Sequence, residues 1–466
     1  MSSCGGVQRE VSILIFIYIL FALASQLLFW RLPVRQAILA TVFSGWLVLP
    51  VGHYARVPLD GEFPYWITGI ALPSDSMLSK GWVVHSTALT GVLLFDRGIL
   101  CRFRASAWDL MALAWCMCPL LPWMMHHRLT PSPLVSCAYL LGVWGTLWVL
   151  GRIYFQTMQD RLLILQWTVL MSLTITPFAW IEGIVGPFLY PHIAQILHPF
   201  RDDGVIRYFG YRPLLMFEHG NQYGLWMAIG GLCSILLLCA KQSLVPWRSI
   251  SNRFDKWIGV VVIGTMLASQ AVGAVLLAAG AALCIYLPRW ARIRWIMMGV
   301  LICLTIGIGI FATGIVPVRK LAEKTSIGRN TIGLFRAVGR GSLPWRVSQD
   351  LKALEVIRKH PITGSERWDW FHQLGTRPWG FVMVTLGQYG VIGLALVLIL
   401  TIGPASTIAW NLPYGKWTHQ LQLDWHCVLI LVVAASDSLL NSFLFYPAIL
   451  LSAGLSSCLP KKQLGE

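Results

Sequence analysis

Charged residues are scarce in this 466-residue chain: they make up 12% of it, whereas hydrophobic residues make up 56%. Because soluble globular domains carry about 25% charged residues, a water-soluble enzyme is excluded. Disordered and collagen-like chains are excluded too, despite 42 Gly and 24 Pro, because too much of the chain is apolar. The mean hydropathy of +0.65 instead predicts a membrane protein that crosses the bilayer many times.

Acidic residues are fewer than basic ones, 20 against 36, which gives a net charge of +16. In a membrane protein such an excess is typical of topology signals, and the chain has no signature of a nucleic-acid-binding fold. The 11 cysteines form no CxxC pair, and nearly all lie inside apolar stretches, so they predict neither a disulfide framework nor a zinc site. The adjacent carboxylates Asp202 and Asp203 lie in a loop, where we expect them to be solvated. We therefore expect no metal, no other cofactor and no nucleic-acid partner.

Apolar segments recur along the whole chain and predict an all-α bundle of about 12 to 13 transmembrane helices. They lie near residues 11–30, 34–52, 81–95, 107–124, 132–150, 162–182, 223–240, 257–271, 272–287, 295–316, 379–410, 425–442 and 443–458. The uncharged stretch 257–287 fits two short helices broken near Ser269-Gln270, or one long tilted helix.

Short basic loops predict the orientation of the bundle. If the segments alternate, the loops that share one side carry Arg31, Arg35, Arg97, Arg102, Arg104, Arg152, Arg161, Lys241, Arg248, Arg253, Lys256, Arg289, Arg292, Arg294, Lys461 and Lys462. The positive-inside bias makes that side cytoplasmic. Residues 53–80, 125–131, 183–222 and 317–378 are then external. This divides the chain into a first helical part (1–316), a large external loop (317–378) and C-terminal helices (379–466).

The external loop 317–378 carries 12 basic and five acidic residues, a balance of +7. Loops of this length escape the charge rule and are exported despite their basicity. Apolar residues at helical spacing predict a helix over 346–359, which His360-Pro361 ends. Arginine binds phosphate through a planar two-pronged fork, so this loop is suited to a lipid-linked diphosphate. The alternative is that it binds anionic lipid headgroups.

Four motifs resemble the O-antigen ligase and O-antigen polymerase superfamily. The run Arg346-Val-Ser-Gln-Asp-Leu-Lys-Ala-Leu-Glu-Val-Ile-Arg-Lys-His-Pro-Ile-Thr-Gly364 is similar to the family's loop signature of an arginine, an amphipathic helix and a His-Pro turn. Gly387-Gln-Tyr-Gly390-Val-Ile-Gly393 resembles its glycine-rich start of the next helix. Glu218-His-Gly-Asn-Gln222 resembles its His-Pro-Asn segment, and Ala268-Ser-Gln-Ala-Val-Gly-Ala274 its Ser-Arg-Gly-Ala segment.

This resemblance implies a glycan transferase of the bacterial inner (cytoplasmic) membrane with a GT-C-like helical scaffold. Such an enzyme moves a glycan from undecaprenyl diphosphate to lipid A-core, as a ligase, or to another glycan, as a polymerase, at the periplasmic face. The reaction is metal-independent and its partners are the lipid-linked donor, the acceptor and membrane lipids. The leaving diphosphate needs fixed cations, and the acceptor hydroxyl needs a general base.

The resemblance also assigns residues. Arg346 matches the family's loop arginine and is expected to hold the diphosphate. The family's second arginine falls on Val272, so Arg212 and Arg377 are the nearest replacements by topology, and the family's catalytic histidine falls on Trp379. The remaining candidates are His372 as the base, Glu366 as the alternative base, and a substrate-binding set of Arg212, His219, Asn221, Arg340, Arg367 and Arg377.

Each assignment also has a purely structural alternative. His219 and His360 lie at helix ends, where they can serve as caps. Glu182 and Asp437 lie inside apolar segments, and Asp437 shares a helix face with Asn441, so both acids can form structural hydrogen bonds within the bundle. For the whole protein, the alternatives are a transporter or flippase of lipid-linked sugar, and a non-catalytic partner in a polysaccharide export complex.

Overall fold

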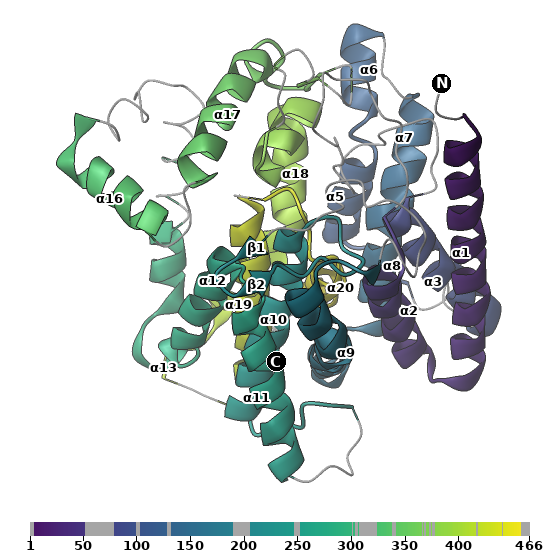
Figure 1. Cartoon of the computed structure of the whole chain (residues 1–466), viewed down its shortest axis with the longest axis vertical. Helices are drawn as coiled ribbons and strands as arrows, with labels where there is room; N and C mark the ends of the chain where they lie inside the picture. The colour runs from purple at the N-terminus through teal and green to yellow at the C-terminus, as the bar shows by residue number, and fades with distance from the viewer. Residues whose placement is uncertain are drawn as a thin grey trace, which may run out of the picture.

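The structure is a computed structural model that describes residues 4–51, 79–98, 103–127, 132–189, 206–246, 252–300, 302, 306, 324–337, 342–365, 367, 370–371, 374, 378–415, 418–439 and 441–457. Helices dominate the described part of the chain, as Figure 1 shows. The strands described are β1 (Ile206–Arg207) and β2 (Gly210–Tyr211), which form a short antiparallel hairpin. The prediction of an all-α membrane protein with several spans is therefore confirmed.

The helices follow the predicted apolar segments closely. In the first half they are α1 (Cys4–Arg31), α2 (Val34–Val48), α3 (Lys80–Phe95), α5 (Ala107–Cys116), α6 (Leu120–His126), α7 (Pro133–Leu140), the π-helical turn η1 (Leu141–Gly145), α8 (Thr146–Tyr154) and α9 (Met158–Val185). In the second half they are α10 (Gly220–Cys239), α11 (Asn252–Ala268), α12 (Val272–Leu283), α13 (Leu287–Trp290), α16 (Ser326–Ala337), α17 (Ser342–Ile357), α18 (Phe381–Asn411), α19 (His419–Ser438) and α20 (Pro447–Ser456).

Seven of the described helical segments are long and apolar enough to cross a membrane, and the bent pair α5–α6 raises the number to eight. The predicted count of 12 to 13 also included segments that form the shorter helices α2, α3, α11 and α20. At 1.5 Å per residue, a 15-residue helix such as α2 spans only about 22 Å, less than the roughly 30 Å of a bilayer core. Most of the predicted segment 295–316 lies outside the described residues.

The break predicted near Ser269-Gln270 is confirmed. Helix α11 ends at Ala268 and α12 begins at Val272. Gln270 has a left-handed backbone (φ 57°), which a continuing helix cannot contain. The alternative of one long tilted helix is therefore wrong, and the break presents a new helix start inside the bundle.

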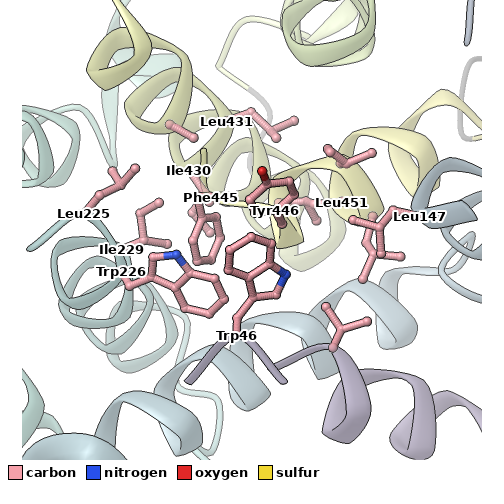
Figure 2. Packing of buried hydrophobic residues seen from close by; sticks show 14 of the residues in the cluster. Trp46, Leu147, Leu225, Trp226, Ile229, Ile430, Leu431, Phe445, Tyr446 and Leu451 are labelled. Atoms are coloured by element: carbon pink, nitrogen blue, oxygen red, sulfur yellow. The ribbon is translucent and has the colours of Figure 1, made fainter. Parts of the chain in front are cut away.

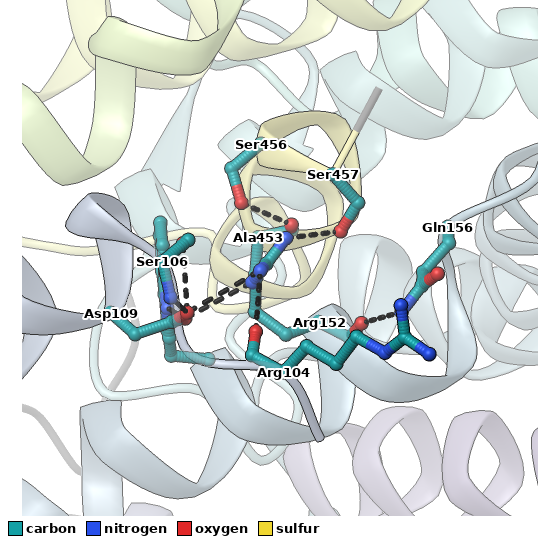
Figure 3. A network of polar contacts seen from close by, with 9 residues as sticks. Arg104, Ser106, Asp109, Arg152, Gln156, Ala453, Ser456 and Ser457 are labelled. Atoms are coloured by element: carbon teal, nitrogen blue, oxygen red, sulfur yellow. Dashed lines mark hydrogen bonds and ion pairs between the residues drawn. The ribbon is translucent and has the colours of Figure 1, made fainter. Parts of the chain in front are cut away.

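Short basic loops come together at one end of the bundle. Arg35 pairs with Asp160 (3.0 Å), and Arg161 pairs with Asp424 (2.6 Å), which joins the starts of α2, α9 and α19. At the same end Arg152 bonds Asp109 (3.0 Å) and the carbonyl of Arg104, as Figure 3 shows. These contacts place three of the predicted basic loops on one side, together with the start of α19, as the alternation of segments requires.

The bundle core lies between α2, α10 and α20 (Figure 2). Trp46 stacks on Tyr446 with ring centroids 3.9 Å apart, and Trp226 packs edge-on against Phe445 at 4.8 Å. Residues 443–446 thus join the aromatic core to the segment that follows α19. Asn441 lies two residues before this aromatic layer.

Candidate functional site

The ends of several helices meet at the end of the bundle opposite the basic loops. Helices α9 and α19 begin at the basic end and finish here, whereas α10, α12 and α18 begin here. Figure 1 shows α17 at the top of the view, next to α18, while α11 reaches the bottom. Because the N-terminus of a helix carries exposed N–H groups and a partial positive charge, three helix starts favour a bound anion.

Four polar side chains from distant segments form one continuous chain of hydrogen bonds. Arg212 donates to Oδ1 of Asn221 (2.6 Å), and Asn221 donates through Nδ2 to Oδ1 of Asn441 (2.8 Å). Arg346 donates through Nη1 to that same Oδ1 (2.8 Å). We call Arg212, Asn221, Asn441 and Arg346 the arginine–amide chain. It brings together three residues that the sequence predicted for substrate binding or catalysis.

Arg212 lies beside the position where a second arginine was expected. Its side chain is buried and lies over Gly220 and Gly224 at the start of α10. A Cβ atom at Gly220 would lie 2.6 Å from Nε of Arg212, and one at Gly224 would lie 2.0 Å from Cβ of Ala271, the residue before Val272. The two glycines therefore leave room for the guanidinium of Arg212 beside the start of α10 and near Ala271.

Arg346 is held by the residue that occupies the expected position of the catalytic histidine. The centre of its guanidinium lies 5.0 Å from the ring centroid of Trp379, a cation–π contact. The backbone N–H of Trp379 donates to Oδ1 of Asp350 at 3.1 Å. Trp379 therefore lies beside Arg346 and Asp350, but its indole has no lone pair to accept a proton. Trp379 positions the arginine instead.

Asn441 is the junction of the site. Its backbone carbonyl accepts from the N–H of Phe381, the first residue of α18 (3.2 Å), and its Nδ2 donates to Oδ1 of Asp437 (2.9 Å). Asp437 therefore orients Asn441, which fixes Oδ1 toward Asn221 and Arg346. The sequence pointed to this residue only through its four-residue spacing from Asp437 within an apolar segment.

Glu182, the other intramembrane acid, has a structural role. Its carboxylate accepts from the backbone N–H groups of Leu214 (2.9 Å) and Leu215 (2.7 Å), and more weakly from Phe188 and Leu189. These bonds fix the segment just after Arg212. Glu182 thus forms structural hydrogen bonds, as the alternative predicted, whereas Asp437 acts on the site through Asn441.

His219 caps α10. Its Nδ1 accepts from the N–H of Asn221 (3.0 Å), and its ring stacks on Phe443 with centroids 5.3 Å apart. The neutral ring therefore carries its proton on Nε2. The cap positions Asn221; the predicted contact of His219 with substrate stays a prediction.

The segments 346–364 and 387–393 contact each other directly. Helix α17 ends at Ile357, and the turn 360–364 that follows lies on the kink of α18. The N–H of Val391 donates to the carbonyl of Pro361, and the N–H of Ser365 donates to the carbonyl of Gly387, both at 2.9 Å. Gly364 (φ 82°) and Gly390 (φ 63°) meet at this contact. A Cβ at Gly364 would lie 2.3 Å from the carbonyl oxygen of Gln388, so glycine is required by close approach as well as by backbone angle. The helix predicted over 346–359 is found as Ser342–Ile357, so it begins four residues earlier than predicted and ends two residues earlier, before His360-Pro361.

Of the remaining predicted site residues, the structure describes Arg367. Arg367 is exposed and is not part of the arginine–amide chain. The predicted base His372, the alternative base Glu366, and the substrate-binding candidates Arg340 and Arg377 lie outside the described residues. Within the part of the chain that is described, no three His, Cys, Asp or Glu side chains lie close enough together to hold a metal ion.

Asp350 is the functional candidate that sequence reasoning missed. Burial raises the pKa of its carboxyl to about 6, although the Trp379 N–H and the charge of Arg346 act to lower that pKa. Its four-residue spacing from Arg346 was the available signal. The site therefore combines guanidinium groups held by amide oxygens with a carboxylate that titrates near neutrality.

Comparison with known proteins gives no relative: the chain matches no protein-family model, no curated protein and no solved structure.

Proposed function

We propose that this protein transfers a glycan from undecaprenyl diphosphate to an acceptor, either lipid A-core or another glycan, at the periplasmic face of the bacterial inner membrane. The scaffold would be a GT-C-like helical bundle. The observation that carries the proposal is the arginine–amide chain, which joins Arg212 to Arg346 across α10, α17 and the segment after α19.

The chemistry of this chain suits a diphosphate leaving group. An amide oxygen fixes a guanidinium by a hydrogen bond without cancelling its charge, as a carboxylate would. Asn221 and Asn441 thus hold the arginines ready at no electrostatic cost to an incoming anion. As the bond between sugar and diphosphate breaks, negative charge grows on the leaving oxygen, and cations already in place stabilise it.

An apolar pocket beside the site suits the lipid part of such a donor. It has a volume of about 120 Å³ and lies between the end of α9, the β1–β2 hairpin and the end of α11. Trp180, Ile184 and Phe209 line it and are exposed. Pro213, the neighbour of Arg212, lines it as well. The pocket suits only a short part of the lipid chain next to the diphosphate, whose charge would then lie against the arginine.

A second candidate function is a non-catalytic partner that binds the lipid-linked glycan. Trp379 at the position expected for the base is the observation that favours it. The two functions differ in one measurable respect: the partner binds the donor without releasing undecaprenyl diphosphate.

The test is an in-vitro transfer assay with the full-length protein in liposomes and a glycan-loaded undecaprenyl diphosphate. We expect Arg346→Ala to lower the transfer rate by about 100- to 1000-fold, as for the loss of one fixed donor to a developing anion. Arg346→Lys should also fail, because an ammonium lacks the fork geometry. Arg358→Ala is the matched control, since Arg358 is an exposed arginine just beyond the end of the same helix. Normal transfer by Arg346→Ala at normal protein level would refute the role.

A further inference from the structure

A carboxylate lies within the site, next to the cation that the proposed function uses. Asp350 follows Arg346 by four residues on α17, so the two side chains share one helix face. Oδ1 of Asp350 accepts from the N–H of Trp379 at 3.1 Å, and the ring of that tryptophan carries the guanidinium of Arg346. The three residues form one unit, in which the carboxylate is fixed relative to the arginine.

A transfer to a hydroxyl acceptor needs a proton acceptor near that arginine. The hydroxyl loses its proton as it attacks the anomeric carbon, and a positioned base accelerates this step by about 100- to 10,000-fold. Trp379 cannot serve, because its indole is a donor only. Asp350 accepts a hydrogen bond from the backbone N–H of that same tryptophan, so its carboxylate is a possible base beside Arg346.

We infer that Asp350 is the general base of the glycan transfer, an inference that rests on the proposed function. The acceptor O–H gives its proton to the carboxylate, and the acceptor oxygen forms a bond to the anomeric carbon. The bond from that carbon to the diphosphate oxygen breaks, and its electron pair leaves with the diphosphate, which Arg346 stabilises. Oδ1 is engaged with the Trp379 N–H, and no hydrogen bond to Oδ2 is found among the described residues, so Oδ2 is the oxygen that accepts the proton.

The environment of Asp350 agrees with this role. With a pKa of about 6 the carboxylate is ionised at pH 7, yet is a stronger base than an ordinary aspartate. Among the described residues, Arg346 on the same helix is the charge that acts on Asp350, and the group that faces it from the segment before α18 is the uncharged N–H of Trp379. Through Arg346 the unit continues to the neutral amides Asn441 and Asn221.

The test compares two nucleophiles with the same lipid-linked donor. A sugar hydroxyl must lose a proton, whereas azide ion has none to lose and forms a glycosyl azide directly. Asp350→Asn should lower transfer to the hydroxyl acceptor by about 100-fold or more, and should leave azide transfer within a few-fold of wild type. The wild-type hydroxyl rate should fall below about pH 6, where Asp350 becomes protonated. Glu355→Gln is the matched control, since Glu355 is an exposed carboxylate on the same helix.

Each outcome discriminates. Loss of both reactions in a variant that still binds the donor would show that Asp350 only positions Arg346, and would overturn the inference. Unchanged hydroxyl transfer by Asp350→Asn would overturn it as well, while leaving the proposed function intact. Donor binding without turnover by the wild-type protein, with either nucleophile, would instead refute the proposed function and the inference together.

Discussion

Replacing Asn441 by Asp changes the side-chain amide at the centre of the site to a carboxylate and adds a negative charge there. Oδ1 of Asn441 accepts from Arg346 and from Asn221, both at 2.8 Å, and Nδ2 donates to Asp437 at 2.9 Å. An aspartate keeps the first two bonds. It places an oxygen where the amide group donated, so two carboxylates meet, and it sets a negative charge against the guanidinium of Arg346.

The size of the effect depends on how strongly the new carboxylate competes with the diphosphate for the guanidinium of Arg346. Unit charges about 4 Å apart interact with about 4 kcal/mol at an effective dielectric constant of about 20, which makes the new ion pair a strong competitor for a phosphate. If one charge-assisted hydrogen bond to the donor is lost, at about 1.5–3 kcal/mol, the Kd for undecaprenyl diphosphate rises about 10- to 100-fold. Asn441→Ala leaves the charge of Arg346 in place and should weaken binding less, although it removes an acceptor from two donors.

The assay is equilibrium binding of labelled undecaprenyl diphosphate to the purified protein in detergent. Asn411→Asp is the matched control, because Asn411 ends α18 in an exposed position and donates to the carbonyl of Thr407. We expect the order wild type, then Asn441→Ala, then Asn441→Asp in decreasing affinity. An Asn441→Asp variant that binds as tightly as wild type, or more tightly than Asn441→Ala, would refute the reasoning.

Three further predictions concern stability and topology. Because the folded state raises the pKa of Asp350 from 3.8 to about 6, its ionisation costs up to about 3 kcal/mol of stability above pH 6, and this cost disappears as the pH falls toward 4. Asp350→Asn should therefore raise the Tm at pH 8 and should not raise it at pH 4. A lower Tm of this variant at pH 8 would contradict the burial of the charge. Gly390→Ala should destabilise the protein by about 3 kcal/mol or more in thermal unfolding, because its Cβ would lie 2.1 Å from the carbonyl oxygen of Ile362 at a positive φ; Gly264→Ala, with open space around the added atom, is the control that should not. A reporter fused at Gly341 should show the external side, and cytoplasmic activity there would refute the placement of the site.

Much of the helical order could be predicted from the sequence, because long apolar runs permit few other structures in a bilayer. The break at Ser269-Gln270 was visible as a polar pair within an uncharged stretch. The number of full spans was not, since apolar length alone does not separate a complete span from a shorter buried helix such as α2 or α20. That difference depends on which neighbours cover the helix.

The site was predictable where a residue type has a chemical reason to be there. Arg346, Arg212 and Asn221 were expected and lie in one chain of hydrogen bonds. Asn441 and Asp350 were not selected, because their roles depend on partners 95 residues or 29 residues away in sequence. Only the folded chain brings Asn441 to Arg346 and Asp350 to Trp379.

The central claim is that the arginine–amide chain binds the diphosphate of a glycan-loaded lipid and stabilises it as the leaving group. The most direct measurement is the release of free undecaprenyl diphosphate from a glycan-loaded donor by purified wild-type protein in liposomes, followed together with the appearance of the glycan on the acceptor. We expect equal amounts of the two products, and the loss of both in Arg346→Ala with its fold intact. A wild-type protein that binds the donor and releases no undecaprenyl diphosphate would contradict the proposed function.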